Sequence, residues 1–176
     1  MEPSLMRYLL FLLSSILLTG CLGTPEGVAP INDFEAKRYL GKWYEIARLD
    51  HSFERGLNKV SAEYSLRQDG GIQVVNRGFS KKDNAWKDAE GKAYFVNDKN
   101  QGHLKVSFFG PFYSSYIIFE LDKTGYDYAF VSGYNNSYLW LLARTPSVDQ
   151  TVINHFVTRS KTLGFKTDEL IFVNQE

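Results

Sequence analysis

The chain of 176 residues contains a single cysteine, so it cannot form an intramolecular disulfide and is not a disulfide-stabilised scaffold. It also has no excess of charge, because 20 basic residues balance 20 acidic ones and create no overall field for nucleic acid. Its three histidines show no metal-ligand spacing. Gly-x-Ser-x-Gly, His-Glu-x-x-His and phosphate-loop motifs are missing, so we expect a protein that is not an enzyme and holds no metal or cofactor.

The long apolar run is confined to the N-terminus and is short. Arg7 precedes about a dozen mostly apolar residues, which is too few for a membrane span but typical of a secretory signal peptide. The run ends at Leu18-Thr19-Gly20-Cys21, which resembles the lipobox of bacterial lipoproteins, whose cysteine thiol receives a diacylglycerol before cleavage. We therefore expect a signal peptide over 1–20, lipid attachment at Cys21 and a lipidated linker over 21–31. A plain signal peptide with an incidental cysteine is the alternative.

Aromatic residues are abundant: 13 Phe, 11 Tyr and 3 Trp make up 15% of the chain. Phe and Tyr favour half-buried pleated surfaces, so the composition favours an all-β domain, which we place at 32–176. Alternating apolar and polar residues between turn signals predict strands at roughly 42–50, 58–68, 72–80, 85–97, 103–109, 115–122, 127–133 and 138–144. Eight sequential antiparallel strands without edges predict an up-and-down barrel.

Two helices are predicted to flank the barrel. The first is short, with Asn32 as its N-cap, Glu35 as the capping partner and Gly41 at its end. The second begins with a capping box of Ser147 and Gln150 and has an apolar stripe at helical spacing. We expect the second helix to pack outside the barrel, because the sixth strand is apolar on both faces. A short closing strand is predicted at 170–173.

An eight-stranded barrel has an interior that holds either side chains or one small ligand. Several positions expected to face inward are small, which favours a cavity: Ala47, Ala62, Ala89, Gly91, Ala93 and Ala129. Alternation gives the candidate lining residues, each of which could also be plain core: Val60, Ala62, Tyr64, Ile72, Val74, Ala93, Phe95, Val106, Phe108, Tyr138, Trp140 and Leu142. Glu45 is expected to point inward too, where its carboxylate needs a tyrosine, an arginine or the ligand as a partner.

Two distant segments resemble signatures of the lipocalin family. Gly41-Lys42-Trp43-Tyr44, after a short helix, is similar to the first signature, and Arg144 at the end of the eighth strand is similar to the last. The middle signature, a Thr-Asp-Tyr turn, is present only in a degraded form at residues 122–128. The strings 39–48, 53–56 and 105–112 resemble the branch that holds bacterial outer-membrane lipocalins and apolipoprotein D.

The paired signature also has a direct physical meaning. Trp43 begins the first strand and Arg144 ends the last, so closure of the barrel brings both residues to the same end. A guanidinium stacked on an indole contributes roughly 1–2 kcal/mol when it is desolvated. We therefore assign Gly41, Trp43 and Arg144 a structural role at the closed end and exclude them from the ligand site.

The resemblance implies a lipocalin that binds fatty acids or lysophospholipids and stores or transports lipid in membrane maintenance. In the family's sorting logic, an aspartate after the lipidated cysteine would favour retention at the inner membrane. This chain has Leu22 there, which implies that the protein is located at the periplasmic face of the bacterial outer membrane. Arg48, Arg55 and Lys59 could meet a phosphate or carboxylate headgroup.

Two other functions stay open. One is a lipid-modifying enzyme that uses Glu45 with a pocket tyrosine. The other is an interaction module that docks another protein or a second copy of itself, as a homodimer, through an aromatic rim at the open end of the barrel: Phe53, Trp86, Phe109, Phe112, Tyr113 and Tyr134.

Overall fold

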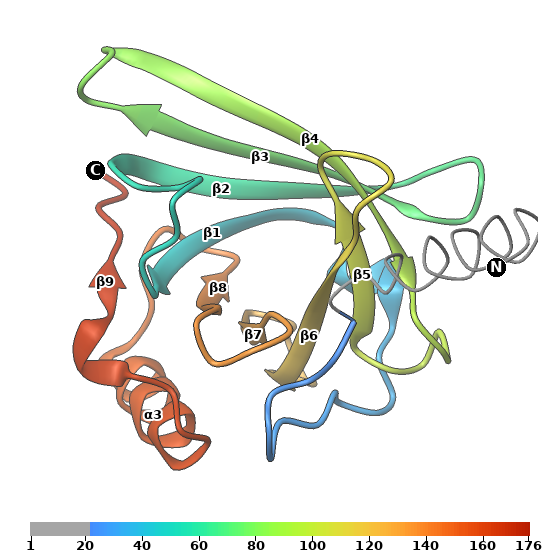
Figure 1. Cartoon of the computed structure of the whole chain (residues 1–176). Helices are drawn as coiled ribbons and strands as arrows, with labels where there is room; N and C mark the ends of the chain where they lie inside the picture. The colour runs from blue at the N-terminus through green and yellow to red at the C-terminus, as the bar shows by residue number, and fades with distance from the viewer. Residues whose placement is uncertain (1–21) are drawn as a thin grey trace, which may run out of the picture.

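The computed structural model describes residues 22–176; the predicted signal peptide and Cys21 lie outside this range. Eight antiparallel strands pair in chain order and the last pairs with the first, which confirms the predicted closed barrel (Figure 1). The strands are β1 (Gly41–Arg48), β2 (Leu57–Leu66), β3 (Ile72–Ser80), β4 (Ala85–Phe95), β5 (His103–Ser107), β6 (Ser114–Leu121), β7 (Tyr128–Ser132) and β8 (Leu139–Ala143).

The C-terminal segment completes the wall where β1 and β2 separate. β1 pairs with β2 only as far as Tyr44, and beyond that point the two-residue strand β9 (Ile171–Phe172) pairs with β1 instead. The amide of Gln175 then bridges both strands by donating to the carbonyl oxygens of Glu45 (2.7 Å) and Val60 (2.9 Å). The predicted closing strand is therefore present, and it satisfies backbone groups that the barrel would otherwise leave unpaired.

Both helices form, but the predicted N-caps were wrong. The short helix α2 (Ala36–Tyr39) begins after Glu35, which makes no side-chain cap bond, and Asn32 lies outside it. Helix α3 (Gln150–Thr162) is capped by Asp149, whose carboxylate accepts from the Thr151 N–H at 2.8 Å. A carboxylate beside the first free N–H groups is a strong cap and replaces the predicted Ser147. A 3₁₀ turn, η2 (Thr167–Glu169), leads from α3 to β9.

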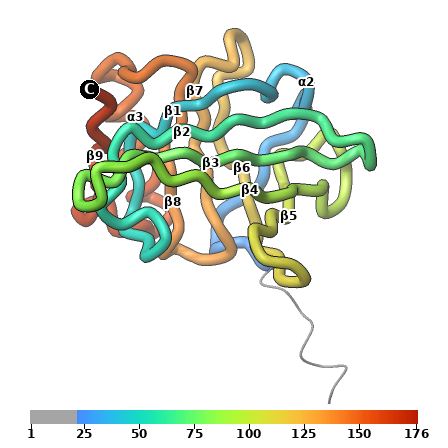
Figure 2. The backbone as a smooth tube through the Cα atoms, turned by 90° about the horizontal axis from the view of Figure 1, so that it is seen from above, coloured from blue at the N-terminus to red at the C-terminus, as the bar shows by residue number. Residues whose placement is uncertain are grey.

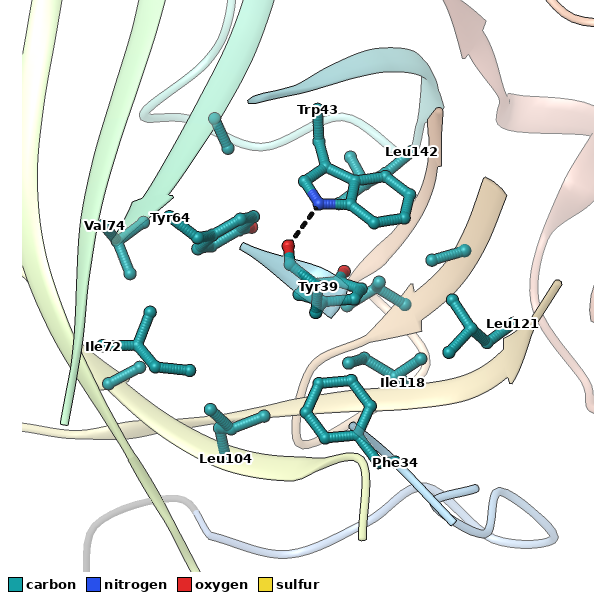
Figure 3. Packing of buried hydrophobic residues seen from close by; sticks show 14 of the residues in the cluster. Phe34, Tyr39, Trp43, Tyr64, Ile72, Val74, Leu104, Ile118, Leu121 and Leu142 are labelled. Atoms are coloured by element: carbon teal, nitrogen blue, oxygen red, sulfur yellow. Dashed lines mark hydrogen bonds between the residues drawn. The ribbon is translucent and has the colours of Figure 1, made fainter. Parts of the chain in front are cut away.

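The barrel wall separates two apolar cores. The inner core lies within the barrel (Figure 3), and the outer core lies between the wall and α3. β6 contributes Ile118 and Leu121 to the inner core but Ile117 and Phe119 to the outer core, which explains why this strand is apolar on both faces. Phe156 of α3 is completely buried in the outer core.

A β-bulge in β1 changes which residues face inward. The register shifts between Glu45, which lies opposite Leu142, and Ala47, which lies opposite Leu141. As a result Glu45 and Arg48 both point into the barrel, while Ala47 packs in the outer core, contrary to its predicted inward position. Ala89 is exposed as well, because the β3–β4 hairpin extends past the rest of the wall (Figure 1).

Arg144 and Trp43 meet at the closed end. The Arg144 guanidinium lies 4.0 Å from the Trp43 ring centroid and donates to the carbonyl oxygens of Lys42 (2.9 Å) and Arg38 (2.6 Å). Gly41 has a φ of +90°, and a Cβ there would lie 3.6 Å from the guanidinium. One side chain thus joins α2, β1 and β8, and a glycine gives the turn its left-handed backbone.

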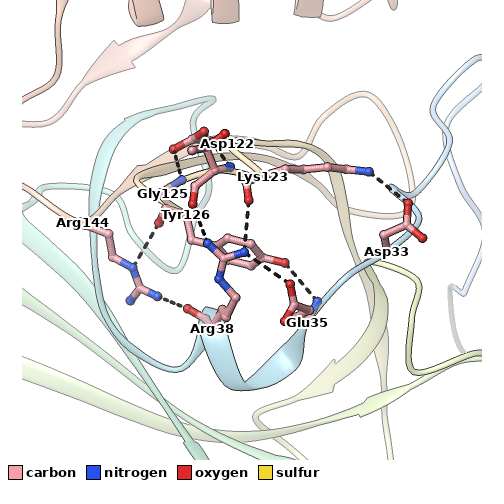
Figure 4. A network of polar contacts seen from close by, with 9 residues as sticks. Asp33, Glu35, Arg38, Asp122, Lys123, Gly125, Tyr126 and Arg144 are labelled. Atoms are coloured by element: carbon pink, nitrogen blue, oxygen red, sulfur yellow. Dashed lines mark hydrogen bonds and ion pairs between the residues drawn. The ribbon is translucent and has the colours of Figure 1, made fainter.

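The segment that carries the degraded middle signature completes this closure (Figure 4). The Asp122 carboxylate accepts from the Gly125 N–H at 2.9 Å, and the Tyr126 hydroxyl accepts from the Glu35 N–H at 3.0 Å. Arg38 lies over the Tyr126 ring, 4.0 Å from its centroid, and donates to the Thr124 carbonyl oxygen at 2.6 Å. The β6–β7 turn and α2 are therefore held together by polar contacts.

The part of the expected linker that the structure describes lies against the barrel. Val28 is buried in the outer core, and the Ile31 N–H donates to the Ile118 carbonyl oxygen at 2.9 Å. Gly102 in turn donates to the Ile31 carbonyl oxygen at 2.9 Å. The chain is thus tied to the wall from about residue 25 onward.

Arg144→Lys is expected to lower the free energy of unfolding by about 2–4 kcal/mol, because an ammonium cannot both cover the indole and reach the carbonyl groups. Arg159→Lys is the control, since Arg159 is an exposed residue of α3 that pairs with Glu120, and it should change the stability by less than about 0.5 kcal/mol. Urea unfolding followed by circular dichroism measures both; equal losses would contradict the assigned role.

Candidate functional site

The inner core brings ten of the twelve predicted lining residues together. Six are buried and four are half-buried against them. The buried ones are Ala62, Tyr64, Ile72, Val74, Ala93 and Leu142, and the half-buried ones are Phe95, Val106, Phe108 and Trp140. The half-buried side chains pack against the buried ones and keep part of their surface accessible.

The other two predicted lining residues lie elsewhere. Val60 is buried beside Gly78, where a Cβ would come within 3.3 Å of its methyl group. Tyr138 lies at the β7–β8 end of the barrel, stacked on His51 with ring centroids 5.1 Å apart. Neither belongs to the inner core.

Three tyrosine hydroxyls meet inside the barrel near its closed end. Tyr116 of β6 lies between Tyr39 (2.8 Å between hydroxyl oxygens) and Tyr64 (3.0 Å). Burial raises the pKa of Tyr64 to about 12, so all three groups stay neutral in water at ordinary pH. Tyr39 and Tyr116 were not predicted as lining residues, because one precedes the first strand and the other lies in a strand that is apolar on both faces.

A cluster of charged side chains lies further along β1, toward the open end. Arg48 donates to the Glu45 carboxylate at 2.6 Å and to the carbonyl oxygen of Glu54 at 3.1 Å. The Glu54 carboxylate accepts from the Trp140 indole N–H at 3.2 Å. All three charged residues are buried, so the partner of the inward-pointing Glu45 is Arg48.

This charged cluster of Glu45, Arg48 and Glu54 has two carboxylates for one guanidinium. Burial raises the pKa of Glu45 well above its usual value, and the nearby Glu54 carboxylate raises it further, against the opposing effect of Arg48. Burial also raises the pKa of Glu54. The cluster therefore favours holding a proton on one carboxylate, which brings its net charge toward zero.

His51 covers the cluster from the first loop. Its ring stacks on Phe53 and Tyr138 and lies 4.5 Å from the Trp140 ring centroid. Burial, helped by the Arg48 charge, lowers the pKa of His51 to about 4, so the ring is neutral at physiological pH. Among residues 22–176, neither His51 Nε2 nor Arg48 Nε has a hydrogen-bond partner.

The three predicted headgroup residues are not brought together. Arg48 is inside the barrel, Arg55 is exposed and paired with Asp50, and the Lys59 backbone N–H donates to Asn174. The bulge in β1 is what sends Arg48 inward. Strict alternation in the sequence gives no sign of that bulge.

Surface hollows lie elsewhere, on the outer wall. Volumes of about 290 and 420 Å³ are lined by residues of β1 to β4, among them Lys42, Ser61 and Arg77, and the larger one also by Gln175. None of the twelve predicted lining residues borders them. Within residues 22–176 there is no cluster of three metal-ligating acids, histidines or cysteines, and no helix that is long and apolar enough to cross a membrane.

The raised pKa of Glu45 predicts a pH-dependent stability. A carboxyl whose folded pKa lies above its unfolded value of about 4.5 stabilises the fold fully below that value and loses this contribution as the pH rises. The stability of Glu45→Gln relative to the wild type should therefore increase as the pH rises above 4.5, with a slope of up to about 1.4 kcal/mol per pH unit. Chemical unfolding from pH 4 to 8 measures this difference. Glu63→Gln, on the outer wall, is the control and should show no such trend.

The comparisons with known proteins agree with this architecture. A lipocalin-like domain model matches residues 34–175. The chain is 61% identical to the outer membrane lipoprotein Blc of Vibrio cholerae over 171 residues, which cover 97% of this chain and all of that protein. It is 49% identical to the outer membrane lipoprotein Blc of Escherichia coli K12 (86% of this chain, 85% of that protein). It is 31% identical to rat apolipoprotein D (85% and 86%).

Solved structures show the same fold at low identity. Insecticyanin from the tobacco hornworm matches with a TM-score of 0.69 at 21% identity, covering 86% of both chains. The cockroach allergen Per a 4 matches with a TM-score of 0.68 at 19% identity, covering 88% of this chain and 96% of that one. The chain belongs to the lipocalin family and, with its close relatives, to the bacterial outer-membrane lipoproteins.

Proposed function

We propose that this lipocalin binds a single-chain lipid, a fatty acid or a lysophospholipid, inside its barrel and stores or carries it at the outer membrane. The observation that supports this most directly is the lining: Phe95, Val106, Phe108 and Trp140 face inward and remain only half-buried. Apolar surface that stays in contact with water is costly, and an apolar guest inside the barrel would cover it.

The free energy gained by burying the lipid tail is sufficient for useful binding. Each buried methylene contributes about 0.8 kcal/mol, so a chain of roughly sixteen carbons contributes on the order of 10 kcal/mol before the cost of immobilisation. That cost amounts to several kcal/mol or more. We therefore expect the lipid to bind with micromolar or tighter affinity, and this proposed function requires no catalytic step.

The polar groups set the orientation that we propose for the lipid. The charged cluster lies toward the mouth, and the tyrosine trio lies at the closed end. The free N–H at Arg48 Nε would be satisfied by a carboxylate or phosphate oxygen. The headgroup then lies at the mouth and the tail extends inward.

We also propose that the signal peptide over 1–20 is removed and that Cys21 carries the acyl chains of the anchor. The lipobox-like sequence and the outer membrane lipoproteins among the relatives support this. Three acyl chains exceed the two signals that stable anchoring requires. Leu22 after the cysteine favours the periplasmic face of the outer membrane.

Binding should quench the intrinsic tryptophan fluorescence, because Trp140 faces the proposed ligand. Val106→Phe places a larger side chain on the inner face and should weaken binding of palmitate or lysophosphatidylethanolamine by about tenfold or more, a loss of about 1.4 kcal/mol. Val75→Phe is the matched control, since Val75 borders the hollow on the outer wall, and it should leave the affinity unchanged. Equal affinities of both variants and the wild type would place the lipid outside the barrel.

The anchor is tested by Cys21→Ser in cells fed an alkyne analogue of palmitate. The wild-type protein should take up the label and sediment with the outer membrane, and the variant should do neither. Labelling that persists in the variant would show that the attachment site lies elsewhere.

A further inference from the structure

The loop between β5 and β6 exposes two phenylalanines. Phe109 and Phe112 are 83% and 74% accessible, and the Phe112 N–H closes the turn by donating to the Phe109 carbonyl oxygen at 3.1 Å. A Cβ at Gly110 would meet nothing within 4 Å, so the loop projects away from the barrel. Single exposed apolar residues are ordinary, but an aromatic pair on a projecting turn indicates a surface that another phase or molecule covers.

The described chain begins at the same end of the barrel. Gly23 lies beside Tyr134 in the β7–β8 loop, where a Cβ would be 4.0 Å from the Tyr134 carbonyl oxygen. In an up-and-down barrel the β1–β2, β5–β6 and β7–β8 loops share one end. Figure 2 shows these loops in teal, yellow and orange along one side, next to the start of the described chain, with α2 on the opposite side.

The distance between this end and the proposed anchor is short. Only Leu22 separates Cys21 from Gly23, and two residues span at most about 7 Å. The chain is held on the wall from about residue 25 onward, so it cannot extend much further. If Cys21 carries the acyl chains, which is the proposed function, the open end lies within reach of the bilayer surface.

We propose that the open end of the barrel docks on the phospholipid surface to which the chain is tethered, with Phe109 and Phe112 inserted among the lipids. Next to this pair, the Lys105 ammonium lies 5.3 Å from the Tyr113 ring centroid. Aromatic side chains with a neighbouring cation are typical of membrane interfaces, where the cation reaches phosphate groups.

This orientation has a functional consequence. The mouth of the barrel faces the bilayer, so a single-chain lipid passes between the bilayer and the barrel without crossing bulk water. A second copy of the chain could dock on this surface without a short tether to the membrane. The short tether therefore favours the bilayer as the partner of this surface.

The test uses the full-length lipidated protein in vesicles of phosphatidylethanolamine and phosphatidylglycerol at about 3:1. The lipidated Cys21 has no free thiol, so Phe112→Cys provides a single site for an environment-sensitive fluorophore. Thr124→Cys, exposed in the β6–β7 turn at the closed end, is the matched control. We expect a blue shift and several-fold stronger quenching by nitroxide-labelled lipids at position 112 than at 124.

Equal quenching at both positions, or none at either, would overturn the docked orientation. A blue shift at 112 that depends on protein concentration and persists without vesicles would assign the surface to a second copy and overturn it too. Mass spectrometry of the N-terminal peptide checks the anchor separately, so a missing anchor is not mistaken for a missing docking surface.

A second measurement separates docking from lipid binding. The double variant Phe109→Ser/Phe112→Ser should take up a fluorescent lysolipid from vesicles several-fold more slowly, while its affinity for the same lipid in vesicle-free solution stays that of the wild type. Unchanged uptake would contradict the proposal. If the wild-type protein itself does not bind the lysolipid in vesicle-free solution, this result would instead contradict the proposed lipid binding.

Discussion

The structure depends on how β1 closes the barrel. This strand pairs with β2 through its first half and with β8 through its second, and β9 takes the position that β2 leaves. Closure removes the sheet edges, so the backbone groups of β1 are satisfied by three different segments of the chain. Arg144 stabilises the closed end by joining the start of β1 to α2 and the end of β8.

The same strand determines the chemistry of the interior. Without the bulge, alternation would place Glu45 inside and Arg48 outside, and a buried carboxylate would lack its cation. The bulge turns both side chains inward and sends Ala47 to the outer core, where it packs with the elements that hold α3. One extra residue in β1 therefore creates the charged cluster and completes the outer core.

Much of the architecture was predictable because it follows from short-range patterns. The strands and the outer helix follow from alternation and helical spacing, and Trp43 and Arg144 could be paired because barrel closure joins the first and last strands. The caps were less predictable, since several side chains near a helix start compete for the same N–H groups: Asp149 replaced Ser147. The bulge, the inward Arg48 and the contribution of Tyr116 depend on tertiary register, which alternation alone does not contain.

The distribution of polar groups along the barrel axis gives the binding proposal its direction. Neutral hydroxyls of Tyr39, Tyr64 and Tyr116 lie at the closed end, where they satisfy one another and present no charge to a hydrocarbon tail. Charged groups occur nearer the mouth, and there two carboxylates and one guanidinium favour a shared proton. An anionic headgroup entering this cluster would meet Arg48 and favour protonation of its carboxylate neighbours. Lipid binding and proton uptake are therefore expected to be linked, so that an anionic lipid binds more tightly as the pH falls.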